Sequence, residues 1–146
     1  MTEATQDRYP EETFDDEYTD DGTMPENVQE LREAIVGRKI VNAEKEARKV
    51  YSYGQGDRLK LTLDNGKVVY LSGTGDCCAY TSLEGFWRDP SSVEHVITGV
   101  GTTEGYEKWH IYADLGDIME LDVSWSSGNP FYYGYGFEIV VEEQGA

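Results

Sequence analysis

Hydrophobic positions between Pro25 and Gly37 recur at the spacing of an α-helix. Val28, Leu31 and Ile35 fall on one face of such a helix, and most positions between them are polar. Proline suits the first turn of a helix, and glycine suits the residue that follows its last turn. The pattern therefore predicts one short amphipathic helix whose apolar face packs on a sheet.

After this helix the pattern changes to the alternation of β-strands, in which successive side chains point to opposite faces. Strands are predicted over residues 39–43, 49–53, 58–64, 67–72, 93–101, 108–114, 118–125 and 131–142, and turns over residues 83–92. Short strands in this order predict an α+β fold that is mainly antiparallel β. We expect a curled β-meander or half-barrel with one N-terminal helix packed on it.

The pair Asn65-Gly66 predicts a tight connection between two of these strands. Asn-Gly favours a hairpin with a two-residue turn. In that register Leu63 would face Val68, and Leu61 would face Tyr70.

Charge divides the chain into an acidic beginning and a compact remainder. Residues 1–30 carry 11 acidic side chains and one basic side chain, with few aliphatic residues. Such a composition is typical of disordered segments. We expect an acidic disordered tail over residues 1–24 and a single compact β-rich domain over residues 25–146.

The whole chain of 146 residues has a net charge of −17, from 29 acidic and 12 basic side chains. A protein this acidic lacks the cationic face that direct nucleic-acid binding needs, and it does not suit an anionic membrane surface. No apolar run approaches the roughly 20 residues of a spanning helix, and the first residues lack the pattern of a signal peptide. We therefore expect a cytoplasmic protein with a protein partner.

Residues 31–60 are the one basic part of the chain, with eight basic and four acidic side chains. Two interpretations remain open for them. The acidic remainder of the chain could neutralise them, or they could form a surface that holds an anionic ligand.

Few residues suggest catalysis or metal binding. Cys77 and Cys78 are adjacent, so a bridge between them would close almost no loop, and in an extended chain they point to opposite faces, away from a common ion. A thiol could pair with His110, oriented by Asp114. However, His110 alternates with Trp109 and is expected at the surface or half-buried, so we expect no metal and no cofactor.

Four carboxylates surround one predicted hairpin: Asp114, Asp117, Glu120 and Asp122. Because Glu120 and Asp122 lie opposite the apolar stripe of their strand, we interpret them as a solvated face. Two tyrosines are more suggestive. Tyr112 and Tyr132 are both expected on outer faces, and exposed tyrosine is a common anchor of protein interfaces.

The chain also resembles a known family, on residues spread over its length. They include the segment 34–40, the hairpin at 61–66, the motif Asp76-Cys77-Cys78, and the segments 109–112 and 119–125. In these residues the chain resembles a domain of unknown function that is widespread in bacteriophages, particularly those of actinobacteria. The resemblance covers about residues 27–143, and Asp-Cys-Cys is its most specific part. Many relatives have Glu where this chain has Ala79. The resemblance implies expression in a bacterial host, and no activity comes with it.

These observations favour a small phage-encoded accessory protein that acts in the host cytoplasm by binding a host or phage protein, without catalysis. One alternative is an acidic DNA mimic that occupies the cationic groove of a DNA-binding protein. Another is a small-ligand binder or enzyme that uses Cys77 or Cys78 together with His110. The candidate binding residues are Asp76, Cys77, Cys78, His110, Tyr112 and Tyr132.

Overall fold

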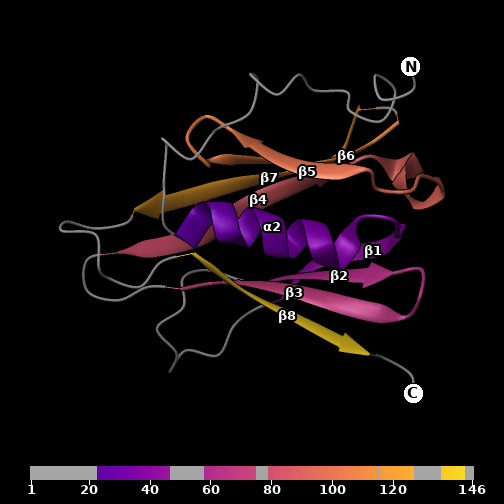
Figure 1. Cartoon of the computed structure of the whole chain (residues 1–146), viewed down its shortest axis with the longest axis horizontal. Coiled ribbons are helices and arrows are strands. Elements are labelled where there is room, and N and C mark those ends of the chain that lie inside the picture. Colours follow the sequence, from indigo (N-terminus) through magenta and orange to yellow (C-terminus); the bar gives the residue numbers. More distant parts are fainter. Residues whose placement is uncertain (1–22, 47–57, 75–78, 115, 127–135, 144–146) are drawn as a thin grey trace.

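Two antiparallel sheets and one α-helix make up the part of the chain that the computed structural model describes, which is residues 23–46, 58–74, 79–114, 116–126 and 136–143 (Figure 1). Sheet A has the strand order β1-β2-β3-β8, and sheet B has the order β4-β7-β6-β5. The architecture is α+β, mainly antiparallel β, with the helix at its N-terminal end, which confirms the predicted fold class.

Among the described residues, each sheet contains four strands, and two helices lie outside the sheets. Sheet A contains β1 (Ile40–Glu46), β2 (Arg58–Leu63), β3 (Lys67–Gly73) and β8 (Phe137–Glu143). Sheet B contains β4 (Tyr80–Arg88), β5 (Gly99–Thr103), β6 (Lys108–Ala113) and β7 (Gly116–Ser126). The helix α2 (Thr23–Ile35) precedes all of them, and a 3₁₀-helix, η2 (Pro90–Glu94), lies between β4 and β5.

The helix α2 covers one open side of the two sheets. It contacts β5 and β8, which are edge strands of sheets B and A (Figure 1). Val28, Leu31 and Ile35 are buried, as their spacing predicted, and Met24 in the first turn is buried as well. Gly37 has a φ of +88°, a conformation that glycine adopts without strain, so the helix ends where the sequence indicated.

The core lies between the two sheets and under the helix. Sheet A contributes Leu59 and Leu61, and sheet B contributes Trp109 and Ile111, all of them fully buried. The two layers meet where the ring of Trp109 packs edge-on against Phe137, at 5.3 Å between centroids. Alternation along the strands therefore predicts the inner faces correctly.

The β2–β3 hairpin lies where the sequence predicted it, but the predicted register differs from the observed one by one residue on one strand. Leu61 pairs with Val69, where the two-residue turn would have paired it with Tyr70. The connection has three residues, because Gly66 donates to the carbonyl of Leu63 and takes a φ of +88°. This is the alternative hairpin in which the left-handed glycine follows a turn.

The predicted turns over residues 83–92 are also wrong for most of that segment. Residues 80–88 form strand β4, the longest partner of β7. Glycine is common in turns, but Gly85 lies at a register shift between Leu83 and Gly85, where a β-bulge accommodates it within the strand. The predicted strand over 93–101 is shorter than expected, since η2 precedes it.

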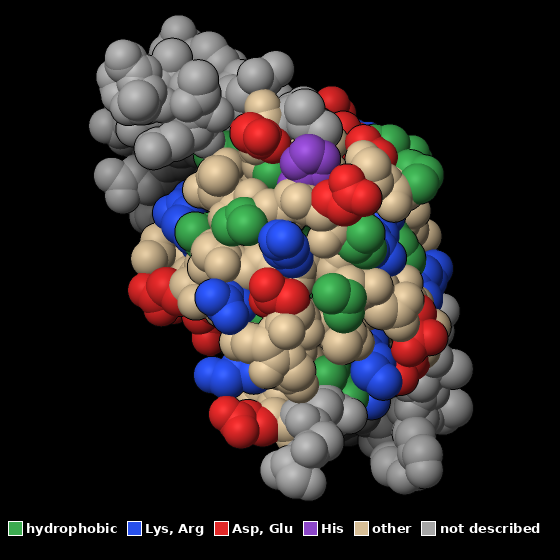
Figure 2. Space-filling model, turned by 90° about the vertical axis from the view of Figure 1, so that its right-hand side faces the viewer, with side chains coloured by type: hydrophobic (Ala, Val, Ile, Leu, Met, Phe, Trp, Pro, Cys, Tyr) green, Lys and Arg blue, Asp and Glu red, His purple; other side chains and the backbone are tan. Residues whose placement is uncertain are grey.

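Charged side chains on the described surface are interspersed, and the face shown in Figure 2 carries acidic and basic groups side by side. Basic residues of the segment 31–60 take part in this pairing. Arg58 Nη2 lies 2.7 Å from Glu46 Oε1, and Lys60 Nζ lies 3.9 Å from Glu46 Oε2. Arg38 Nη1 lies 3.7 Å from Asp64 Oδ1. These three therefore have acidic partners within the fold.

None of the described helices is both long enough and apolar enough to cross a membrane.

Candidate functional site

The outer face of sheet B carries the candidate site. Along β6, Trp109 and Ile111 point into the core, so His110 and Tyr112 project from the other face. His110 is nevertheless only 8% exposed, and the expectation of a surface or half-buried histidine is wrong. Side chains of both neighbouring strands enclose its ring.

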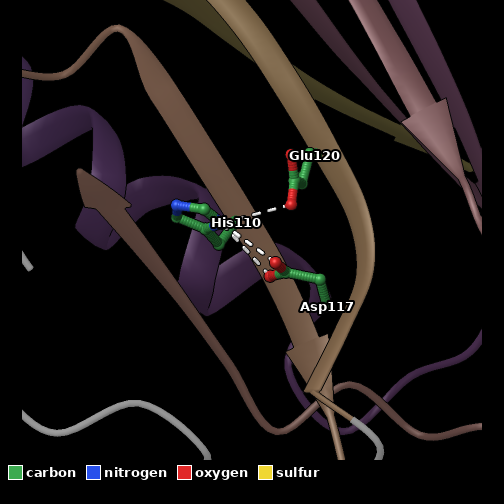
Figure 3. A group of neighbouring side chains, drawn as sticks. All are labelled: His110, Asp117 and Glu120. Atoms are coloured by element: carbon green, nitrogen blue, oxygen red, sulfur yellow. Dashed lines mark hydrogen bonds and ion pairs between the residues drawn. The ribbon is translucent and has the colours of Figure 1, made fainter. Parts of the chain in front are cut away.

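His110 is held at both of its ring nitrogens. Nε2 lies 2.7 Å from the hydroxyl of Thr103 on β5, and Nδ1 lies 3.2 Å from each carboxylate oxygen of Asp117 on β7 (Figure 3). A proton on Nδ1 would let His110 donate to Asp117 and accept from Thr103, which satisfies the whole ring. A hydroxyl can also accept, so Thr103 can serve the other tautomer equally well.

Glu120 completes the cluster from the same strand as Asp117. Its Oε2 lies 3.9 Å from Nδ1 of His110 (Figure 3). A hydrogen bond with Asp117 raises the pKa of Glu120, and burial and the charge of Asp117 raise it further, while His110 and Lys108 act in the opposite direction. The two carboxyl groups are thus close enough to share a proton. We call His110, Asp117 and Glu120 the HDE cluster.

A β-bulge makes this cluster possible. Ile111 pairs with Met119, whereas Tyr112 pairs with Asp117, so Ile118 is an extra residue in β7. In a regular strand, residues 117 and 120 would point to opposite faces. The bulge turns both carboxylates to the face of His110 and leaves Ile118 and Met119 buried, and bulges frequently redirect side chains in this way.

The bulge also explains why sequence patterns missed the cluster. Asp117 and Glu120 were recognised as acids of one hairpin, but alternation assigned Glu120 to a solvated face and could not combine it with Asp117. The side chain of Glu120 is 32% exposed, so the solvated-face interpretation is only partly right for it, and Asp117, which was not assigned to that face, is 17% exposed. Asp122 fits it better, since it is exposed and lies 2.8 Å from Lys108.

Tyr112 does not form the exposed platform that its position suggested. It is only 7% exposed, and its ring lies over Gly99 on β5. A Cβ atom at Gly99 would collide with the tyrosine hydroxyl and ring. Because Gly99 has no side chain, the ring of Tyr112 can pack against the sheet. Tyr112 is therefore not an exposed anchor for a protein partner.

The exposed aromatic on this face is a different residue, Trp87. It lies on β4 directly opposite Glu120, and 52% of it is exposed. Cross-strand partners project from the same face, so Trp87 lies beside the HDE cluster. The sequence did not single it out, because residues 83–92 had been predicted to form turns.

A second histidine pairs with an acid elsewhere on the surface. His95 Nδ1 lies 3.1 Å from Asp114 Oδ1. The thiol alternative used Asp114 as an acid that could orient His110, but Asp114 pairs with His95, and Asp117 lies beside His110. The other candidate residues lie outside the described ranges: Asp76, Cys77, Cys78 and Tyr132.

Comparison with known proteins identifies the family but no activity. Searches of curated proteins and of solved structures each returned no significant match. A family model does match residues 33–139, from the last turn of α2 into β8, a range that includes the HDE cluster. The expected resemblance to a domain of unknown function is thereby confirmed. The chain belongs to the family of the domain of unknown function DUF7448.

Proposed function

We propose that this chain is a phage-encoded accessory protein that acts in the host cytoplasm by binding another protein, without catalysis. The observation that carries the proposal is the exposure of Trp87 on strand β4. Tryptophan is mostly buried in folded proteins, and exposed tryptophan is enriched at the energetic centres of protein interfaces.

The surroundings of Trp87 favour a docking surface on the outer face of sheet B. The next residue, Arg88, donates to Ser92 Oγ at 2.8 Å and to the carbonyl of Ile40 at 3.1 Å, which ties the end of β4 to the rest of the fold. Trp87 is therefore presented on an anchored strand. A strand that is held in place in this way loses little backbone entropy when its side chains bind a partner.

The charge around Trp87 indicates the chemistry of the partner. Glu120 lies opposite it, and Asp122 follows on the same face. Lys108 is the basic side chain that pairs with these acids. A complementary partner would offer an apolar pocket for the indole, bordered by Lys or Arg side chains.

The experiment compares three forms of the full-length protein as bait in a bacterial host lysate: wild type, Trp87→Ala and Val141→Ala. Val141 is an exposed apolar residue on sheet A and serves as the matched control. We expect one defined protein to bind the wild type and V141A. With that protein purified, W87A should weaken binding at least about tenfold, and V141A should change it little.

Two results would contradict the proposal. One is capture of no protein by the wild type. The other is a partner that binds W87A as tightly as the wild type, because the interface would then lie elsewhere.

The DNA-mimic alternative finds less support among the described residues. A mimic presents unpaired carboxylates that replace phosphates, whereas Glu46 and Asp64 are examples of described acids that face basic partners. The same binding assay separates the two ideas, since a mimic loses affinity steeply as salt concentration rises. The thiol–imidazole alternative rests on Cys77 and Cys78, outside the described ranges.

A further inference from the structure

The HDE cluster brings three potential metal ligands together. One ligand atom from each of His110, Asp117 and Glu120 lies within 4.8 Å of the others. In tetrahedral coordination, ligand atoms about 2.1 Å from a zinc ion lie roughly 3.4 Å from one another, so rotations of the side chains would bring the three ligand atoms to this spacing. Within the described ranges, this is the one group of three such side chains that is so closely spaced.

The imidazole is positioned as a metal-binding histidine requires. Its side chain is only 10% exposed, and Nδ1 faces the carboxylate oxygens of both acids. The opposite nitrogen, Nε2, is already held by Thr103 at 2.7 Å. Histidines that bind metals usually donate their second N–H to an oxygen, which sets the tautomer and the ring orientation.

The balance of charge also favours a cation. Two carboxyl groups converge on one imidazole nitrogen, while Lys108 Nζ lies 4.0 Å from Glu120 Oε1 and closer, at 2.8 Å, to Asp122 Oδ1. A divalent ion placed between the three ligands would offset both carboxylates. The neutral ring would bind the ion in the tautomer that carries its one proton on Nε2: the lone pair of Nδ1 faces the ion, and the Nε2–H donates to Thr103.

We propose that His110, Asp117 and Glu120 bind a divalent transition-metal ion, with Zn²⁺ as the best fit. One imidazole nitrogen and two carboxylates suit Zn²⁺, Co²⁺ or Mn²⁺, whereas Mg²⁺ and Ca²⁺ prefer oxygen ligands alone. Glu120 is the most exposed of the three ligands, at 32%, so an ion can enter from the side of this residue. This inference goes beyond the proposed protein binding and does not depend on Trp87.

The test uses untagged, metal-free full-length protein with Cys77 and Cys78 both replaced by serine, because thiols would bind the same ions. Titration calorimetry with Zn²⁺ should give one site per chain. Visible absorption on addition of Co²⁺ should report the nitrogen–oxygen ligand set. Mg²⁺ at the same concentrations should give no comparable signal.

Substitutions then assign the ligands. Asp117→Asn and Glu120→Gln should each weaken Zn²⁺ binding at least about tenfold, and His110→Ala should weaken it at least as much. His95→Ala is the matched control, since His95 also pairs with an aspartate, and it should leave binding unchanged. E120Q keeps the shape of the side chain, so it tests the site even if the other two variants fold poorly.

Three results would overturn the proposal: no binding of Zn²⁺ or Co²⁺ at millimolar concentration, binding that E120Q and D117N leave intact, or binding that H95A removes. Zn²⁺ binding without capture of any partner would support the metal site and contradict the proposed protein binding. Capture of a partner that W87A weakens, without any Zn²⁺ binding, would support the proposed protein binding and contradict the metal site.

Discussion

Two polar side chains, Asn27 and His110, are buried in different parts of this molecule, and their surroundings differ in kind. Asn27 on α2 meets both backbone groups of Phe137: its Nδ2 donates to the carbonyl at 3.0 Å, and its Oδ1 accepts from the N–H at 2.7 Å. Donors and acceptors are matched one to one. The side chain of Asn27 therefore pairs with the backbone of β8 as a neighbouring strand would, and it joins the helix to β8.

His110 meets a surplus of acceptors instead. Asp117 and Glu120 both direct carboxylate oxygens at one ring nitrogen, and Thr103 occupies the other. No buried side-chain nitrogen or oxygen among the described residues lacks a partner, so both regions are satisfied. The difference is that the donors and acceptors of Asn27 match those of Phe137, whereas two carboxylates of the HDE cluster converge on one ring nitrogen, an arrangement that we propose binds a cation. Matched polar groups indicate structure, and a surplus of one kind indicates a site.

The sharpest test of this comparison is Asn27→Ala, for which we expect the largest loss of stability. Both backbone groups of Phe137 would lose a buried partner, and each unsatisfied group costs about 1–3 kcal/mol. The free energy of unfolding, measured by urea denaturation, should fall by roughly 3 kcal/mol. Gln29→Ala is the control on the exposed face of the same helix and should cost less than about 0.5 kcal/mol. Equal effects of the two substitutions would show that Asn27 is not a structural link.

His110→Ala should cost less than N27A in metal-free protein. The substitution leaves Asp117 and Thr103 without the ring, but Glu120 beside them is 32% exposed, so water can reach the vacated position. We expect a loss of about 1 kcal/mol in the free energy of unfolding. His95→Ala removes the partner of an exposed aspartate and should cost less than about 0.5 kcal/mol. A loss in H110A as large as in N27A would make His110 a structural residue as well.

These two regions also show how far the sequence alone reaches. The helix and its buried face follow from the spacing of Val28, Leu31 and Ile35, and the inner faces of most strands follow from alternation. Asn27 has no such signal, because its partner is the backbone of a residue 110 positions later. A polar residue inside an apolar stripe is the one hint that the sequence offered.

The HDE cluster could not be found because alternation fails at the bulge. A register shift of one residue in β7 reverses which side chains share a face, and no local composition marks Ile118 as the extra residue. The exposed position of Trp87 on a strand was not predicted, for a related reason. Gly85 and the proline after Asp89 are typical of turns, but here the glycine accommodates a bulge within a nine-residue strand.

The smallest expected effect comes from Glu120→Gln, and it distinguishes the two regions by its dependence on pH. The hydrogen bond and charge of Asp117 raise the pKa of Glu120 in the folded protein. Below the usual range of a glutamate both folded and unfolded chains hold the proton, and Glu120 resembles glutamine. As the pH rises, the unfolded chain loses its proton first, so the wild type loses stability relative to E120Q until the folded protein has ionised too.

In buffer with a chelator, urea denaturation should therefore show E120Q gaining stability relative to the wild type as the pH rises above the usual range of a glutamate, by less than about 1 kcal/mol because Glu120 is partly exposed. Glu84→Gln, at an exposed position on β4, controls for the loss of one negative charge. If the difference in the free energy of unfolding between E120Q and the wild type does not change with pH, Asp117 and Glu120 do not compete for a proton. Added Zn²⁺ should reverse the order, because the metal stabilises only the protein that keeps both carboxylates. A substitution that stabilises the empty protein and destabilises the loaded one belongs to a binding site, and no substitution at Asn27 should behave in that way.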